Sequence, residues 1–516
     1  MKYLIGFLAL MPSFGAETLR LGRVNTDDAR YLADQLDLMG FDIWQVADRF
    51  VDVVLSAEEL AQLRSAGYAV DLVGQGQPLR DIHPDVSRGT IPTGYLDLSQ
   101  IVDSMTQTEA NFPNIAKVVN LTATYSAPTT VEGRSIYAIK ISDNVNSDED
   151  EPVFLLVSNH HAREIVTPVI ALDALEKLTT LYGIDPQITA LVDQYEIWIA
   201  PVWNPDGYVH VFNVDNLWRK NRRVFGGGIG VDLNRNYEFG WTSGCSGSTN
   251  PSSESYKGPS ANSEAETQTM IAWSMDRHFA KLLDFHSFGR EVLYGYACLT
   301  HPWLSFWQSE AITLSMQSGY IGEIRAPSAD GEHYQWQFGT RGTFGFLTET
   351  ATSFQPTYVS AQSEASLVWP GTLHLLERPI PLWGHVRDAQ TGDPIEAIID
   401  VQGVTFPNGE QITSGGAFGR YHLFAPPGTY DLAFSANGYT PVMHQVTLDA
   451  TSQQLEVIMG EFCMGDFNAS TRVDMLDYVN LVNNFGQPGG IFDTNGSGLV
   501  NLDDLLLVLP LWGPCL

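Results

Sequence analysis

The feature that most constrains the fold is the apolar run 153–157 (Val-Phe-Leu-Leu-Val), which is followed closely by His161 and Glu164. An unbroken run of this kind is typical of a strand that is buried on both faces of an α/β sheet. Ligands of such sheets gather at the carboxyl ends of the strands, so both side chains are expected to meet beyond the strand end. Zn²⁺ accepts an imidazole and a carboxylate, and a catalytic zinc needs one further protein ligand and water.

Further motifs follow in a fixed order along the chain. They are Trp-Arg-Lys-Asn-Arg at 218–222, Val-Asp-Leu-Asn-Arg-Asn at 231–236, Asp-Phe-His-Ser-Phe at 284–288 and Gly-Phe-Leu-Thr-Glu at 345–349. The segments 201–208, 255–259 and 261–264 belong to the same set. Together these motifs resemble the zinc metallocarboxypeptidases of the carboxypeptidase A type, over residues 93–378.

The resemblance implies a zinc site and a general base. His161, Glu164 and His286 would bind Zn²⁺. Asp232 would accept a hydrogen bond from the far nitrogen of His161 and so fix its tautomer. Glu349 would take a proton from the attacking water and pass it to the leaving amine.

The resemblance also implies a clamp for the substrate. Arg222 would stabilise the oxyanion that forms on the scissile carbonyl. Asn234 and Arg235 would hold a free C-terminal carboxylate, with Arg235 as its bidentate partner, and Arg163 would lie along the substrate path. Such a clamp separates an exopeptidase from an endopeptidase.

The chain departs from the family pattern in two places. Counting back from Trp336, the position of the family's mobile tyrosine falls near Pro327, and Phe288 stands where a second tyrosine is common. We therefore expect weakened substrate binding before lost activity. The side-chain pocket is expected to involve Ala297 and the region of Tyr334, neither of which is a buried acid that would select Lys or Arg. The sequence thus favours an apolar or aromatic C-terminal residue in the substrate.

Residues 93–378 alternate strand-like runs with helical patterns, which predicts an α/β domain with a mixed sheet and helices on both faces. Helices are predicted at 98–111 and 167–182, and strands at 118–121, 135–141, 153–157, 196–201 and 281–285.

Before this domain, residues 17–88 predict a small α+β unit of order β-α-β-β-α-β. Ser56 and Glu59 form a capping-box pattern at the start of its second helix. The order resembles the activation segment that precedes the catalytic domain in many of these enzymes. The polar stretch 74–89 is predicted to be the linker.

After the catalytic domain, residues 380–460 contain short alternating runs separated by turn residues, which predict a β-sandwich. This segment resembles the transthyretin-like domain of regulatory-type carboxypeptidases. It shows no catalytic constellation, and a role as a structural spacer is favoured.

Residues 463–516 contain two similar acidic loops, each followed by an apolar helix. Oxygen-bearing side chains occupy loop positions 1, 3, 5, 9 and 12, as in an EF-hand-like Ca²⁺ site. Gly498 fills the turning position 6 of the second loop, Thr471 stands there in the first, and both loops end in Asp instead of Glu. The pair resembles dockerin modules, which implies a protein partner or a surface anchor; solubility alone is the alternative. The candidate ligands are Asp466, Asn468, Ser470, Asp474 and Asp477, then Asp493, Asn495, Ser497, Asn501 and Asp504.

Composition and the chain start point to export. A net charge of −32 and a pI near 4.5 argue against nucleic acid or an anionic membrane as a partner. Residues 1–16 carry one cation, a short apolar run and small residues, which predicts a signal peptide and a secreted, extracellular or periplasmic protein without a membrane span after its removal. Four cysteines allow three pairings, and Cys245–Cys298 with Cys463–Cys515 keeps each bridge within one domain.

The expected function is that of a secreted zinc-dependent carboxypeptidase acting on peptides or proteins with a free C-terminus. Two alternatives remain open. One is a zinc amidase or peptidase that acts on cell-wall peptides or acylated amino acids. The other is a catalytically dead binding protein that is displayed through its C-terminal module. The sequence does not say whether the N-terminal unit inhibits or is cleaved.

Overall fold

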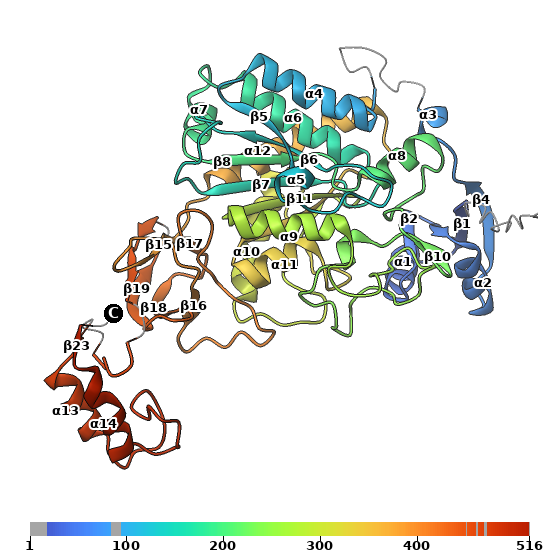
Figure 1. Ribbon diagram of the computed structural model, residues 1–516. Helices are drawn as coiled ribbons and strands as arrows, with labels where there is room; N and C mark the ends of the chain where they lie inside the picture. The colour runs from blue at the N-terminus through green and yellow to red at the C-terminus, as the bar shows by residue number, and fades with distance from the viewer. Residues whose placement is uncertain (1–17, 84–93, 450, 461–462, 469–471, 515–516) are drawn as a thin grey trace, which may run out of the picture.

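The computed structural model describes residues 18–83, 94–449, 451–460, 463–468 and 472–514 (Figure 1). The predicted signal peptide, Ser470, Thr471 and Cys515 lie outside the described residues.

Residues 94–378, the segment predicted to be catalytic, contain an eight-stranded sheet in the order β13-β12-β14-β11-β7-β8-β6-β5. Its centre is parallel: β7 pairs with β8 and β11, and β11 pairs with β14. Towards the two edges, β6 pairs antiparallel with β5 and β8, and β12 pairs antiparallel with β14 and parallel with β13. The sheet is therefore mixed, as predicted. The strands are β5 (Ala116–Asn120), β6 (Tyr137–Ile141), β7 (Val153–Ser158), β8 (Glu196–Ala200), β11 (Lys281–Ser287), β12 (Glu291–Leu293), β13 (Ile324–Arg325) and β14 (Phe344–Thr350).

Helices cover both faces of this sheet, because its central strands are apolar on both sides. In Figure 1, α4 (Leu98–Asn111) and α6 (Val166–Thr180) lie above the sheet, and α9 (Ala265–Arg277) and α11 (His333–Arg341) lie below it. The α/β prediction is confirmed, and the predicted helices end within two residues of the observed ones. The remaining elements of this segment are α5 (Leu121–Thr124), α7 (Pro186–Val192), α8 (Pro205–Asn213), β9 (Val224–Phe225), β10 (Gly228–Ile229), η1 (Leu233–Arg235), α10 (Leu304–Gln317) and α12 (Tyr358–Glu377).

The N-terminal unit has the predicted β-α-β-β-α-β order and its own apolar core. Its antiparallel strands lie in the order β2-β3-β1-β4. The capping box is present: the Glu59 amide donates to Ser56 Oγ at 3.2 Å, and the Ser56 amide donates to Glu59 Oε2 at 3.0 Å. The elements are β1 (Arg20–Asn25), α1 (Ala29–Leu38), β2 (Asp42–Ala47), β3 (Phe50–Leu55), α2 (Ala57–Ser65) and β4 (Val70–Gln75).

The predicted linker, 74–89, is more ordered than a loose connection. β4 runs through Gln75, and a short helix, α3 (Leu79–Ile82), follows. Leu79 is fully buried, and the Gln77 amide donates to Asn216 Oδ1 at 3.1 Å, so this part packs on the catalytic domain. Residues 74–83 of the predicted linker are therefore ordered and packed, and residues 84–89 lie outside the described part.

Residues 382–459 form two small sheets around a separate apolar core, in agreement with a β-rich segment. One sheet contains β17, β15, β20 and β21, and the other contains β16, β18 and β19. Arg420 and His385 contact Asp150 of the catalytic segment, which fixes the two parts against each other. The strands are β15 (Leu382–Asp388), β16 (Ile398–Val401), β17 (Arg420–Leu423), β18 (Gly428–Ser435), β19 (Val442–Leu448), β20 (Gln453–Gln454) and β21 (Val457–Met459).

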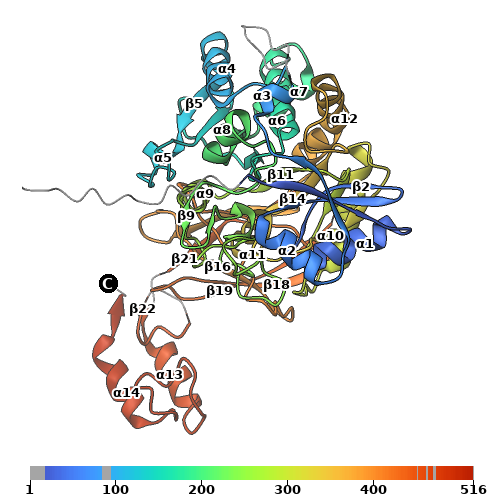
Figure 2. The same cartoon turned by 90° about the vertical axis from the view of Figure 1, so that its right-hand side faces the viewer.

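The last segment stands apart from the catalytic sheet (Figures 1 and 2). It contains β22 (Arg472–Val473), α13 (Met475–Asn483), α14 (Leu502–Val508), η2 (Leu509–Leu511) and β23 (Gly513–Pro514) around a small apolar core. Asp477 and Asp504, the last residues of the two acidic loops, are fully buried. Asp477 accepts hydrogen bonds from the amides of Phe467 and Asp474, and Asp504 accepts from those of Asn495 and Asn501. In this structure the two aspartates therefore hold their loops to the following helices.

Two further observations concern the chain as a whole. Cys245 and Cys298 form a disulfide, which belongs to the pairing that keeps each bridge within one domain. Within the described residues, no helix combines the length and the apolar character needed to cross a membrane.

Candidate metal centre and substrate cavity

Three parallel strands bring the candidate residues together. His161 and Glu164 lie in the loop that follows β7, and His286 lies near the end of the neighbouring strand β11. Glu349 lies on β14, where it is the register partner of His286. The site therefore forms at the carboxyl ends of the strands, as the apolar run before His161 predicts.

Nitrogen and oxygen atoms of three buried side chains converge there. His161 Nδ1 lies 2.8 Å from Glu164 Oε1, and His286 Nδ1 lies 3.1 Å from Glu164 Oε2. The two Nδ1 atoms are 3.1 Å apart. These ligand atoms form a group that could hold a metal ion. Two imidazole nitrogens facing one carboxylate suit Zn²⁺, which would satisfy all three at once.

Asp232 lies behind His161. His161 Nε2 is 3.1 Å from Asp232 Oδ1, and Arg219 Nη2 donates to Asp232 Oδ2 at 2.9 Å. Burial alone would raise the pKa of Asp232, but Arg219 and His161 hold it well below the usual range of an aspartate. An ionised Asp232 keeps the proton of His161 on Nε2, which leaves Nδ1 free to bind a cation.

Asp284 lies behind His286 and is shared by three histidines. Its Oδ1 is 3.3 Å from His286 Nε2 and 3.2 Å from His160 Nδ1, and its Oδ2 is 2.8 Å from His333 Nδ1. All four side chains are buried. His160 therefore belongs to the layer behind the ligands. Asp284 had no role in the sequence prediction, although it stands two residues before His286.

Glu349 lies beside the metal-ligand group but is not part of it. Its Oε2 has no hydrogen-bond partner among the described residues, and Arg325 Nη2 lies 3.9 Å from its Oε1. Burial and the negative charge of Glu164 raise the pKa of Glu349 to about 8. A divalent cation held by the ligand group would oppose this effect and favour the ionised carboxylate.

A cavity of about 610 Å³ opens in front of these groups. This volume suits a ligand the size of a short peptide. The catalytic segment contributes the ligand residues, Glu349, Asn234 and Arg235, and the N-terminal unit forms part of the wall, with Asp34, Asp37 and Asp42 among its residues. The cavity thus combines the predicted metal group with the predicted carboxylate clamp.

The prediction for Arg222 does not fit this geometry. Arg222 is not among the residues that line the cavity; it stacks on Trp218 and lies 3.5 Å from Glu132. Arg219, three residues earlier in the same motif, lines the cavity and bonds Asp232. The motif contains two arginines, and the hydrogen bond from Arg219 to Asp232 distinguishes them.

Arg163 lines the cavity but does not lie free along a substrate path. Its side chain is fully buried, stacks on Phe354 and forms a bidentate ion pair with Asp42 of the N-terminal unit. The sequence prediction missed this pair because it joins two domains across a long separation in the chain.

The cavity contains a buried acid that the sequence prediction did not name. Glu332 lines the cavity, is 3% exposed and forms an ion pair with Arg235. Ala297 and Tyr334, the residues expected there, do not line the cavity, and the Tyr334 hydroxyl donates to Gly295 O. No tyrosine occurs among the described residues that line the cavity, in agreement with the departures noted at Pro327 and Phe288.

Comparisons with known proteins agree with this geometry. A family model described as zinc carboxypeptidase matches residues 101–359. The chain is 28% identical over 352 residues to a protein of Talaromyces marneffei named inactive metallocarboxypeptidase ecm14, which covers 59% of this chain and 58% of that protein. It is 34% identical over 209 residues to carboxypeptidase A2 of Mus musculus, which covers 40% of this chain and 48% of the relative. The chain thus matches only about half the length of these curated relatives.

Among solved structures, carboxypeptidase A of Helicoverpa armigera superposes on the chain with a TM-score of 0.56 at 22% identity. The superposition covers 69% of this chain and 95% of that one. At this identity the likeness shows the fold alone.

Proposed function

This chain belongs to the zinc carboxypeptidase family, and from that premise we propose that it is a secreted enzyme that removes the C-terminal residue of peptides or proteins. The proposal rests on the position of Glu349 beside the group His161, Glu164 and His286. Its Oε2 atom has no hydrogen-bond partner among the described residues, so this carboxylate is available as a base. The predicted signal peptide and the Cys245–Cys298 disulfide support an extracellular location.

The roles of the residues follow from their positions. His161, Glu164 and His286 would hold Zn²⁺, which when bound activates water and polarises the scissile carbonyl. Glu349 takes a proton from the attacking water and delivers it to the leaving amine. Arg219, and not Arg222, is the arginine of that motif that lines the cavity, so Arg219 would stabilise the oxyanion.

Asn234 and Arg235 form the site for the substrate's terminal carboxylate. Asn234 Oδ1 accepts from the His333 amide at 2.8 Å, which fixes the Asn234 side chain and leaves its amide group as a donor. Arg235 offers the planar fork that matches a carboxylate. A peptide that ends in an amide has no negative charge and only one acceptor oxygen, so it would lose the bidentate ion pair with Arg235.

The test of this function is turnover of a blocked dipeptide with a free C-terminus. The purified full-length protein should hydrolyse it, lose activity with a zinc chelator, and regain activity when zinc is restored. If protein that contains zinc shows no turnover, the catalytically inactive binding protein is favoured instead. The fungal relative, which is named an inactive metallocarboxypeptidase, is the reason to test this alternative. Equal cleavage of acylated amino acids that lack a peptide bond would favour the amidase.

The N-terminal unit is proposed to restrict access to the cavity, because its residues form part of the cavity wall and Asp42 pairs with Arg163. Removing residues 1–88 should raise kcat/KM for bulky peptides about tenfold or more, as expected if the closed form is nine-tenths populated. Asp42→Asn in the full chain should give part of this increase. Asp71→Asn, which changes an exposed carboxylate on the far strand β4, should give none. Unchanged kcat/KM in a folded truncated protein would contradict the proposal.

The C-terminal repeats are proposed to bind Ca²⁺ and to attach the protein to a partner or surface. Their helices α13 and α14 are too short to be stable alone, and the acidic loops before them need a cation to offset like charges. The helix content of segment 463–516, measured by far-ultraviolet circular dichroism, should therefore increase when Ca²⁺ is added and decrease when a chelator is added. Asp466→Ala together with Asp493→Ala should abolish the response. An unchanged spectrum would leave solubility as the role of these loops.

A further inference from the structure

Glu332 is a buried acid of the cavity that the proposed mechanism does not use. Its Oε1 accepts from Arg235 Nη1 at 2.9 Å, and its Oε2 has no hydrogen-bond partner among the described residues. Burial raises the pKa of Glu332 to about 7, against the opposing effect of Arg235. A buried carboxylate that is held on one oxygen alone is costly unless it gains a second partner.

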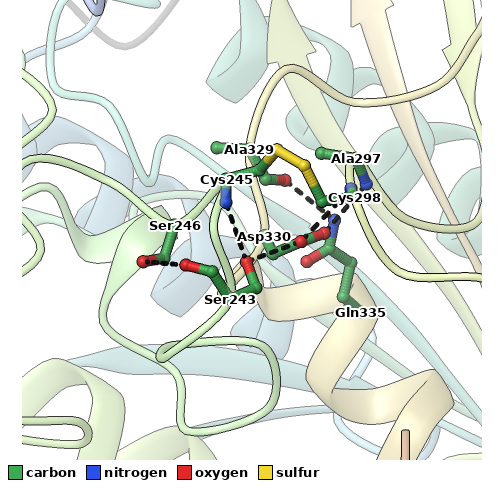
Figure 3. Close-up of a disulfide and its surroundings, with 8 residues drawn as sticks. All are labelled: Ser243, Cys245, Ser246, Ala297, Cys298, Ala329, Asp330 and Gln335. Atoms are coloured by element: carbon green, nitrogen blue, oxygen red, sulfur yellow. Dashed lines mark hydrogen bonds between the residues drawn. A yellow bond between two sulfur atoms is a disulfide. The ribbon is translucent and has the colours of Figure 1, made fainter. Parts of the chain in front are cut away.

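The segment that carries Glu332 is held firmly in place (Figure 3). Asp330 accepts from the Ala297 amide at 2.8 Å and from the Ser243 hydroxyl at 2.7 Å, and its own amide donates to Cys245 O. The disulfide between Cys245 and Cys298 joins the same two loops. Gln335 Oε1 accepts from the amides of Gly331 and Glu332. Glu332 therefore remains beside Arg235 when a substrate enters, because its backbone is fixed on both sides.

Binding of a substrate changes the charge balance around Arg235. Without substrate, Arg235 and Glu332 form one buried ion pair. The terminal carboxylate of a peptide adds a second anion to the same guanidinium. Arg325 and His286 act on Glu332 through charge at longer range, but Arg235 is its ion-pair partner among the described residues. In a site of low dielectric constant the remaining negative charge is unfavourable unless a second cation enters or the acid takes up a proton.

We propose that Glu332 selects substrates whose C-terminal residue is cationic, that is, lysine or arginine. The side chain of that residue would supply the second cation and the missing partner of Glu332. The wall of the same cavity also contains Leu293, Ala329 and Leu347, apolar side chains suited to the aliphatic stem of such a residue. This inference rests on the proposed carboxypeptidase function, and it replaces the apolar preference that the sequence favours.

The test compares blocked dipeptides that end in arginine, in citrulline and in leucine. Citrulline has nearly the shape of arginine but no charge, so it isolates the effect of the cation. The parent enzyme should cleave the arginine peptide with a kcat/KM about 10- to 100-fold above that of the citrulline peptide, the range expected for one buried charge pair. Glu332→Gln should reduce this ratio to near one while leucine peptides are cleaved at least as well as before.

Glu254→Gln is the matched control. Glu254 is a second buried glutamate of the same cavity, but it lies 3.7 Å from Lys220 and makes no contact with Arg235. The same substitution there should leave the ratio of arginine to citrulline turnover unchanged. Thermal unfolding of both variants shows whether either change has disturbed the fold.

Binding measurements separate this inference from the proposed function. Calorimetry with the same peptides on Glu349→Gln, and on Glu349→Gln with Glu332→Gln, needs no turnover. A preference for the arginine peptide that depends on Glu332 would uphold the inference even in a protein without activity. Equal binding of the arginine and citrulline peptides, or a preference that persists in the double variant, would overturn it.

Discussion

Glu349→Gln should leave zinc binding intact and lower kcat by roughly 10²- to 10⁴-fold, the range for loss of a general base. The substitution keeps the size of the side chain but removes its ability to take a proton from water. Because Glu349 is outside the ligand group, zinc content measured by atomic absorption should stay at the level of the parent protein. Single-turnover kinetics with a blocked dipeptide would locate the loss in the chemical step.

His286→Ala is the comparison for that result. It removes one of the three ligand side chains, so both zinc content and activity should fall together. Full activity in Glu349→Gln protein of verified mass would contradict the assigned role of this carboxylate, whatever the zinc content.

Arg235→Ala should weaken the binding of peptides with a free C-terminus by about 2–4 kcal/mol, which lowers kcat/KM by about 30- to 1000-fold. The physical reason is the loss of a charge-assisted bidentate partner in a buried site. Amidated peptides should be poor substrates of the parent protein, and their kcat/KM should fall little further in the variant. If the parent protein cleaves amidated and free peptides equally well, the clamp, and with it the exopeptidase assignment, is wrong.

Arg235→Ala also leaves Glu332 buried without its partner, which should lower stability by about 3–5 kcal/mol. The double variant Arg235→Ala with Glu332→Gln removes that charge. It should recover much of the lost thermal stability and none of the lost affinity for free C-termini. Comparing the two variants therefore separates folding from recognition.

The central sheet and the metal group could be predicted because local patterns determine them. The apolar run before His161 and the short run before His286 fix two strand ends, and adjacent parallel strands bring those ends together. The capping box at Ser56 and Glu59 is equally local. These features depend on residues a few positions apart.

The parts that were missed depend on contacts between distant residues. Glu332 meets Arg235 across 97 positions, and Asp42 meets Arg163 across 121. The choice between Arg219 and Arg222 depends on which of them reaches Asp232, which spacing within one motif does not reveal. The charge distribution of the cavity depends on such pairs. A sequence motif identifies one residue of each pair but not its distant partner.

The register of β11 and β14 has a consequence for thermal inactivation. His286 and Glu349 are direct neighbours on adjacent strands, so their separation is set by the ladder of backbone hydrogen bonds and not by a loop. Both strands lie in the buried interior of the sheet, whose hydrogen bonds open only when the whole domain unfolds. The ligand and the base therefore cannot drift apart through local fraying. Loss of activity on heating should coincide with cooperative unfolding of the catalytic domain, even where the N-terminal unit or the C-terminal repeats melt earlier.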